Sequence, residues 1–180
     1  MADEVVRLLL KRVPLSSPAT LPNFHRFRIK GRIYPAIKPL ENNNVTGRVL
    51  LDITDPELEV LDIFEDVEYE RRLVDVTLID NVISISTPFP HCEKYNWKFL
   101  PCLSLQDRYE KLDAYAYVWV DKNDPNLYGD WDFEEWRRTH MNDFLNMTVG
   151  FVEELEGPDS KTRVATYESF FNNGDKPPMS

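Results

Sequence analysis

Cysteine is scarce in this sequence: its 180 residues include only Cys92 and Cys102, and they form no Cys-x-x-Cys pair. Small secreted folds that rely on disulfides use more cysteines than this, so a reducing compartment and a cytoplasmic location are predicted. His91 adjoins Cys92, but no second pair of ligands follows at the spacing of a zinc site. The sequence therefore predicts no metal centre.

Long hydrophobic runs are also missing. The apolar run near the N-terminus, Leu8–Leu10 before Lys11, is too short for a signal peptide or a membrane span. Basic residues are also few: the sequence has 21 Lys and Arg and 31 Asp and Glu, which gives a net charge of −10. This balance disfavours nucleic acid and anionic membranes as partners. Basic residues do alternate with apolar ones over 25–32, which is typical of a half-exposed strand.

Hydrophobic residues make up 42% of the sequence and aromatic residues 12%, which is enough to form a folded core. Periodicity predicts a helix over 3–12, a helix that begins at the capping-box sequence of Thr54 and Glu57, and strands over 70–79 and 112–120. The run of asparagines at 42–44 predicts a turn. Helices and strands mix without a βαβ rhythm. An α+β fold with a largely antiparallel or mixed sheet is therefore favoured.

The domain is expected to span residues 1–156. Within it, 82–106 is an irregular insertion and 132–156 is one long C-terminal helix with an apolar stripe. Residues 157–180 are polar and contain prolines, which predicts a flexible tail.

One short acidic run stands out, with acids at positions 62, 65, 66 and 68 around Phe64. A carboxylate crowded by other carboxylates and an apolar wall has a raised pKa, so it can both accept and release a proton. Glu65 is the candidate catalytic residue. The alternative, that these acids only solvate a helix end, stays open on spacing alone.

Several segments together resemble the gamma-glutamylcyclotransferase-like superfamily, and within it the plant avirulence-induced branch. They are FHRFRIKGRIYPAI (24–37), GRVL (47–50), LDIFEDVEYER (61–71), AYAYVW (114–119) and YGDWDFEEW (128–136), in matching order. The resemblance implies a small, closed or nearly closed β-barrel with flanking helices. It implies an acyltransferase that converts γ-glutamyl compounds to 5-oxoproline, with Glu65 as the catalytic glutamate and with no cofactor. The implied partner is a small-molecule or peptide γ-glutamyl substrate.

Tyr69, Tyr115 and Tyr117 are candidates for the wall of the pocket, with core packing as the alternative for each, and Tyr69 and Tyr117 are the candidate substrate-binding residues. The family also carries a Tyr-Gly-Ser/Thr-Leu loop that holds the glutamyl end of the substrate. That motif is absent from this sequence, and Met1 and Ala2 stand where the loop is expected to finish.

Two expectations follow from these departures. Met1 is interpreted as a translation start chosen downstream of the natural one. The irregular segment is interpreted as translated intron, because the sequences on either side of it join smoothly when it is removed. If the segment belongs to the protein, it is expected to form a lid or a partner-binding loop. A non-catalytic binding module that keeps the fold is the alternative function.

Overall fold

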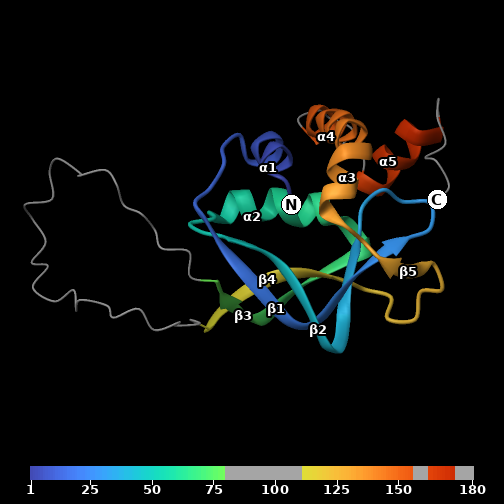
Figure 1. Cartoon of the computed structure of the whole chain (residues 1–180). Coiled ribbons are helices and arrows are strands. Elements are labelled where there is room, and N and C mark those ends of the chain that lie inside the picture. The colour runs from blue at the N-terminus through green and yellow to red at the C-terminus, as the bar shows by residue number, and fades with distance from the viewer. Residues whose placement is uncertain (80–110, 156–161, 173–180) are drawn as a thin grey trace, which may run out of the picture.

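The computed structural model describes residues 1–79, 111–155 and 162–172, so the predicted insertion at 82–106 lies outside the described residues. In chain order, the elements are α1 (Asp3–Leu10), β1 (Ser16–Ile29), β2 (Ala36–Leu50), α2 (Asp55–Glu65), the 3-10 turn η1 (Asp66–Glu68), β3 (Tyr69–Leu78), β4 (Lys111–Trp119), β5 (Leu127–Asp130), α3 (Phe133–Thr139), α4 (Met141–Leu155) and α5 (Arg163–Asn172). Figure 1 shows the helices gathered on one side of the strands.

The strands form one antiparallel sheet in the order β2-β1-β3-β4, with β5 paired to β1. This confirms the predicted α+β fold with an antiparallel sheet. Of the expected closed or nearly closed barrel, closure is not found, because β2 and β4 form no hydrogen-bonded ladder with each other in the described part of the chain. Closure requires such a ladder between the two outermost strands, so the sheet is open.

The predicted turn at 42–44 is also wrong, because these residues lie inside β2. The register of β1 against β2 shifts between Pro22 and Phe24. Asn23 and Asn42 have φ of 59° and 61°, and the Asn42 N–H donates to the Asn23 side-chain oxygen at 3.3 Å. Asparagine tolerates this left-handed conformation better than most residues, in bulges as well as in turns. The asparagines therefore mark an irregularity within a long hairpin.

The helix α2 begins as the sequence predicts and ends at the candidate catalytic residue. At its start, the Thr54 N–H donates to Glu57 at 2.9 Å, which is one half of a capping box. At its end, Asp66 adopts φ of 57°, and the chain leaves the helical direction directly after Glu65. A non-glycine residue in this region is strained and needs support from its surroundings.

The predicted long helix over 132–156 is two helices. It begins as expected, with the Asp132 side chain accepting a hydrogen bond from the Glu135 N–H at 2.6 Å. The helix breaks at His140, and α4 starts at Met141. The break brings Trp136 of α3 to a ring-centroid distance of 5.5 Å from Phe144 of α4. Both side chains belong to the main core between the helices and the sheet.

The structure differs from the expected flexible tail at Arg163–Asn172, which form α5. Tyr167 of α5 is 2% exposed and packs edge-on against Tyr34 at 5.1 Å. The Tyr167 hydroxyl accepts a hydrogen bond from the Ile33 N–H at 3.2 Å. These contacts fix α5 against the segment between β1 and β2, although the overall polarity of residues 157–180 gives no sign of them.

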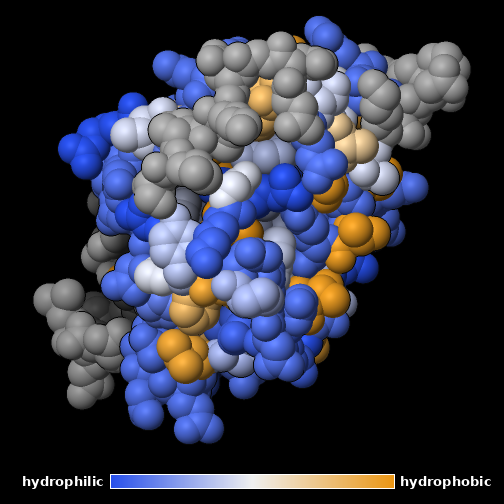
Figure 2. All heavy atoms as spheres, turned by 90° about the vertical axis from the view of Figure 1, so that its right-hand side faces the viewer, coloured by the Kyte–Doolittle hydropathy of each residue, from blue (hydrophilic) through white to orange (hydrophobic). Residues whose placement is uncertain are grey.

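The face shown in Figure 2 is largely hydrophilic, and its hydrophobic residues lie in small separate groups. Among the described residues, no helix is both long enough and apolar enough to cross a membrane.

Phe151 should contribute most of the packing energy of α4. It is fully buried, and its ring lies 5.2 Å from that of Phe64, beside Glu65. Phe151→Ala should lower the free energy of unfolding by about 3–5 kcal/mol, because it leaves a cavity in a packed core. Urea denaturation checks this. Val149→Ala on the same helix is the control, since Val149 is 40% exposed and should cost well under half as much. Equal losses for the two variants would contradict the packing of α4.

Candidate active site

A cavity of about 210 Å³ lies where the end of α2, the sheet and the helices α1, α3, α4 and α5 meet. All five predicted site residues line it: Met1, Ala2, Glu65, Tyr69 and Tyr117. Tyr115, which shares a strand face with Tyr117, does not line the cavity and is 61% exposed. In the described part of the chain, no group of three or more His, Cys, Asp or Glu side chains is placed to hold a metal ion.

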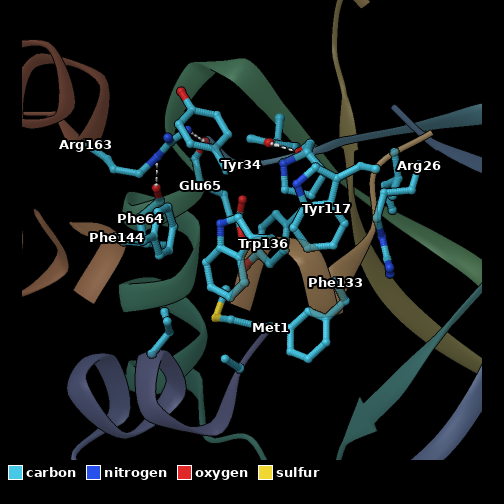
Figure 3. Close-up of a pocket in the computed structure, with 16 residues that line it drawn as sticks. Met1, Arg26, Tyr34, Phe64, Glu65, Tyr117, Phe133, Trp136, Phe144 and Arg163 are labelled. Carbon is cyan, nitrogen blue, oxygen red and sulfur yellow. Dashed lines mark hydrogen bonds between the residues drawn. The ribbon is translucent and has the colours of Figure 1, made fainter. Parts of the chain in front are cut away.

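Glu65 is the last residue of α2, and its half-buried side chain faces the cavity (Figure 3). Its carboxylate accepts no hydrogen bond from the described residues, unlike those of its neighbours Asp62, Asp66 and Glu68. Burial raises the pKa of Glu65 to about 7, while the cation of Arg163 opposes this rise. A carboxyl group with this pKa exchanges a proton readily near neutral pH.

Arg163, the first residue of α5, holds the turn that carries Glu65. It is 2% exposed, and its Nε donates to the Phe64 carbonyl oxygen at 2.7 Å, drawn as a dashed line in Figure 3. Its Nη2 donates to the Glu68 carboxylate at 2.7 Å and to the Glu65 carbonyl oxygen at 3.5 Å. The guanidinium also lies 4.3 Å from the centre of the Tyr34 ring. A buried cation with these partners fixes its surroundings tightly.

Two further contacts complete this support. The Val164 N–H of α5 donates to the Asp66 carboxylate at 3.0 Å, so the strained residue after Glu65 is held by the same helix. The Tyr34 hydroxyl donates to Glu68 at 2.7 Å. Burial raises the pKa of Tyr34, so it stays a neutral donor at physiological pH.

The two predicted tyrosines present their rings to the cavity while their hydroxyls are engaged elsewhere. The Tyr117 hydroxyl donates to Asp62 at 2.7 Å, and the Tyr69 hydroxyl donates to the Pro35 carbonyl oxygen at 2.5 Å. Burial raises the pKa of both tyrosines, and both remain protonated. Each therefore serves as a wall of the cavity and as a link between elements.

Met1 and Ala2 close the cavity on the side of α1. Burial and the nearby Arg26 lower the pKa of the Met1 amine. Trp131, Phe133 and Trp136 add an aromatic wall, with Phe133 and Trp136 stacked at 5.8 Å. The indole N–H of Trp136 is buried and has no hydrogen-bond partner among the described residues.

Sequence reasoning missed several cavity residues. Arg163 lies in the segment expected to be a tail, and Arg26 reads as one basic position on a strand face. Tyr34 and Pro35 lie in residues 32–37, which the sequence predicts as a second strand after a junction near Gly31. In the structure β2 begins only at Ala36, so these two residues lie between β1 and β2 and line the cavity.

Comparison with known proteins shows the family of this chain. The family described as "Gamma-glutamyl cyclotransferase, AIG2-like" matches residues 1–133. The chain belongs to this family. AIG2-like protein D from Arabidopsis thaliana is 52% identical over 161 residues, which are 89% of each chain. AIG2-like protein C from the same plant is 45% identical over 93% of this chain and 82% of its own. The resemblance seen in the sequence is thus confirmed.

A solved structure agrees with the fold. The solution structure of At5g39720.1 from Arabidopsis thaliana is 35% identical, covers 87% of each chain and has a TM-score of 0.54. The family match ends at residue 133, so it includes Glu65 and excludes Arg163. The helix that supports the turn at Glu65 therefore comes from beyond the matched region.

Replacing Arg163 should destabilise the protein. Arg163→Met removes the buried cation from Glu68 and leaves this carboxylate with only the longer ion pair to Arg32, at 3.4 Å, which should lower the free energy of unfolding by about 3 kcal/mol. Adding Glu68→Gln should recover part of this loss, because the poorly compensated charge is then removed. Chemical denaturation checks both variants, with the exposed Arg137→Met as control. A loss for Arg163→Met no larger than for the control would contradict the role of the buried ion pair.

The raised pKa of Glu65 also predicts a pH-dependent stability. Between its ordinary value of 4.5 and about 7, the folded protein keeps a proton that the unfolded chain has lost. The free energy of unfolding should therefore fall over this range and level off above it. Glu65→Gln lacks this loss, so its stability relative to wild type should grow by on the order of 2 kcal/mol between pH 5 and 8. A difference that stays constant with pH in denaturation experiments would contradict the raised pKa.

Proposed function

We propose that this protein is a cyclotransferase that converts a γ-glutamyl compound to 5-oxoproline and releases the attached amine or amino acid. Glu65 is the proton acceptor and donor of this reaction. The observation that carries the proposal is the carboxyl group of Glu65, which faces the cavity without a hydrogen-bond partner among the described residues and has a pKa of about 7.

The reaction needs a group that moves protons between two nitrogens. The α-amine nitrogen of the substrate attacks its own γ-carbonyl carbon, and a carbon–nitrogen bond forms. The bond from that carbon to the leaving nitrogen then breaks. The protons lost by the α-ammonium group end on the leaving nitrogen, so no water and no redox partner is consumed. One carboxyl group placed between the two nitrogens can carry these protons.

The surroundings of Glu65 suit this task. Arg163 and Asp66 hold the turn that carries it, so the carboxyl group has a defined position relative to a bound substrate. Aromatic rings and the apolar side chains of α1 line the cavity, and burial among them raises the pKa of Glu65.

The second candidate function is a binding module that takes a γ-glutamyl ligand without turning it over. The observation that favours it is that the Tyr69 hydroxyl donates to the Pro35 carbonyl oxygen and the Tyr117 hydroxyl donates to Asp62. Neither hydroxyl is therefore left to stabilise the charge that develops on the γ-carbonyl oxygen. Binding of a γ-glutamyl peptide in calorimetry with no release of 5-oxoproline would favour this function.

Glu65→Gln should reduce the turnover of the preferred γ-glutamyl substrate by at least about a hundredfold, the usual scale of a general acid–base contribution. Release of 5-oxoproline, followed by chromatography over a panel of γ-glutamyl amino acids, peptides and amines, measures this. The exposed Glu59→Gln on the same helix is the matched control and should keep wild-type turnover. Undiminished release from Glu65→Gln would defeat the assignment.

The wild-type protein should also show a pH dependence set by Glu65. Because the carboxylate form accepts the first proton, kcat/KM should rise with pH and level off above about 7.

A further inference from the structure

Arg26 is the second arginine that lines the cavity, and its surroundings differ from those of Arg163. It lies on β1, and its side chain is half-buried. Its Nη2 donates to the Thr46 carbonyl oxygen of the neighbouring strand at 3.1 Å. Its guanidinium lies 5.3 Å from the centre of the Trp131 ring, which also lines the cavity. These contacts hold the guanidinium in one place against the wall.

No acidic side chain of the described residues forms an ion pair with Arg26, whereas Arg163 is paired with Glu68. Burial lowers the pKa of Arg26, and no nearby acid offsets this effect. A guanidinium stays protonated in proteins, so Arg26 brings a positive charge to the cavity wall, and its side chain makes a single hydrogen bond, to Thr46, among the described residues. A half-buried cation of this kind is stabilised most by an anion that reaches it.

Arg26 and Glu65 lie apart in the cavity. Figure 3 shows Glu65 on the same side as Arg163, and Arg26 beyond the Tyr117 ring. The charged side chains that shift the pKa of Glu65 are Arg163 and Glu68 rather than Arg26. The cavity therefore offers a proton-exchanging carboxyl group at one place and an uncompensated cation at another.

The planar guanidinium matches a carboxylate, which it can bind through two parallel hydrogen bonds. Every γ-glutamyl compound with a free glutamyl end carries one carboxylate beside its α-amine. When the released group is an amino acid, the substrate carries a second. Either would place an anion on Arg26 while the reacting nitrogens face Glu65.

We propose that Arg26 is the binding site for a substrate carboxylate in this cavity. This inference rests on the proposed function, because it takes a γ-glutamyl compound as the ligand. It makes Arg26 a substrate-binding residue with no part in the proton transfer. If the bound carboxylate belongs to the released amino acid, Arg26 also makes the protein selective for γ-glutamyl amino acids over γ-glutamyl amines.

Affinity is measured by calorimetry in the Glu65→Gln background, so that binding is followed without turnover. The ligands are γ-glutamyl-alanine and γ-glutamyl-ethylamine, which differ only in the carboxylate of the released group. Adding Arg26→Met should weaken the binding of γ-glutamyl-alanine at least about tenfold, the scale of a charge-assisted hydrogen bond. Arg26→Lys should restore part of the affinity, because it restores the charge. Arg7→Met, which removes an exposed positive charge on α1, should change nothing.

The two ligands distinguish the source of the carboxylate. If Arg26→Met weakens only γ-glutamyl-alanine, Arg26 binds the carboxylate of the released amino acid. If it weakens both ligands equally and Arg26→Lys recovers both, Arg26 binds the α-carboxylate of the glutamyl group. Unchanged affinity for both ligands, or an equal loss that Arg26→Lys does not recover, would overturn the proposal. The parent protein and its Glu65→Gln variant test the proposed function separately, through release of 5-oxoproline.

Discussion

The buried guanidinium of Arg163 is the interaction on which the rest of the site depends. It joins α5 to the end of α2 through the Phe64 carbonyl oxygen and the Glu68 carboxylate. A charge at 2% exposure is tolerated only when its partners stay in place, because an unpaired buried charge is costly. The turn that carries Glu65 therefore cannot move without breaking the contact with α5. The strained backbone of Asp66 is held by the same helix, through the Val164 N–H.

This arrangement sets the acidity of Glu65 by two opposing effects. Burial favours the neutral carboxyl group, and the nearby guanidinium favours the carboxylate. Without Arg163, the pKa of Glu65 would be higher, and less of the carboxylate form would be present to accept a proton at neutral pH. Without burial, the carboxylate would be too weak a base to take a proton from an ammonium group. The position of one buried arginine thus connects the packing of α5 to the chemistry proposed for α2.

Local patterns in the sequence predicted the parts of this structure that are held by local forces. The start of α2 depends on Thr54 and Glu57, which are neighbours in the chain, and the inner face of α4 follows helical spacing. Glu65 could be singled out because its acidic and aromatic neighbours are also local. Arg163 could not, because its partners lie nearly a hundred residues earlier in the chain and its own segment is polar. The place of Arg26 in the cavity could not be predicted for a similar reason, because a basic residue in a strand does not indicate which residues its side chain will face.

The central claim is that Glu65 is a carboxyl group whose pKa lies near neutrality. The most direct measurement is an NMR pH titration of the side-chain carboxyl carbons, with the Glu65 signal assigned by its loss in Glu65→Gln. We expect a midpoint of about 7 for this signal. A midpoint near the ordinary value of 4.5 would show that Glu65 is a solvated carboxylate at a helix end and not a proton-exchanging group near neutral pH.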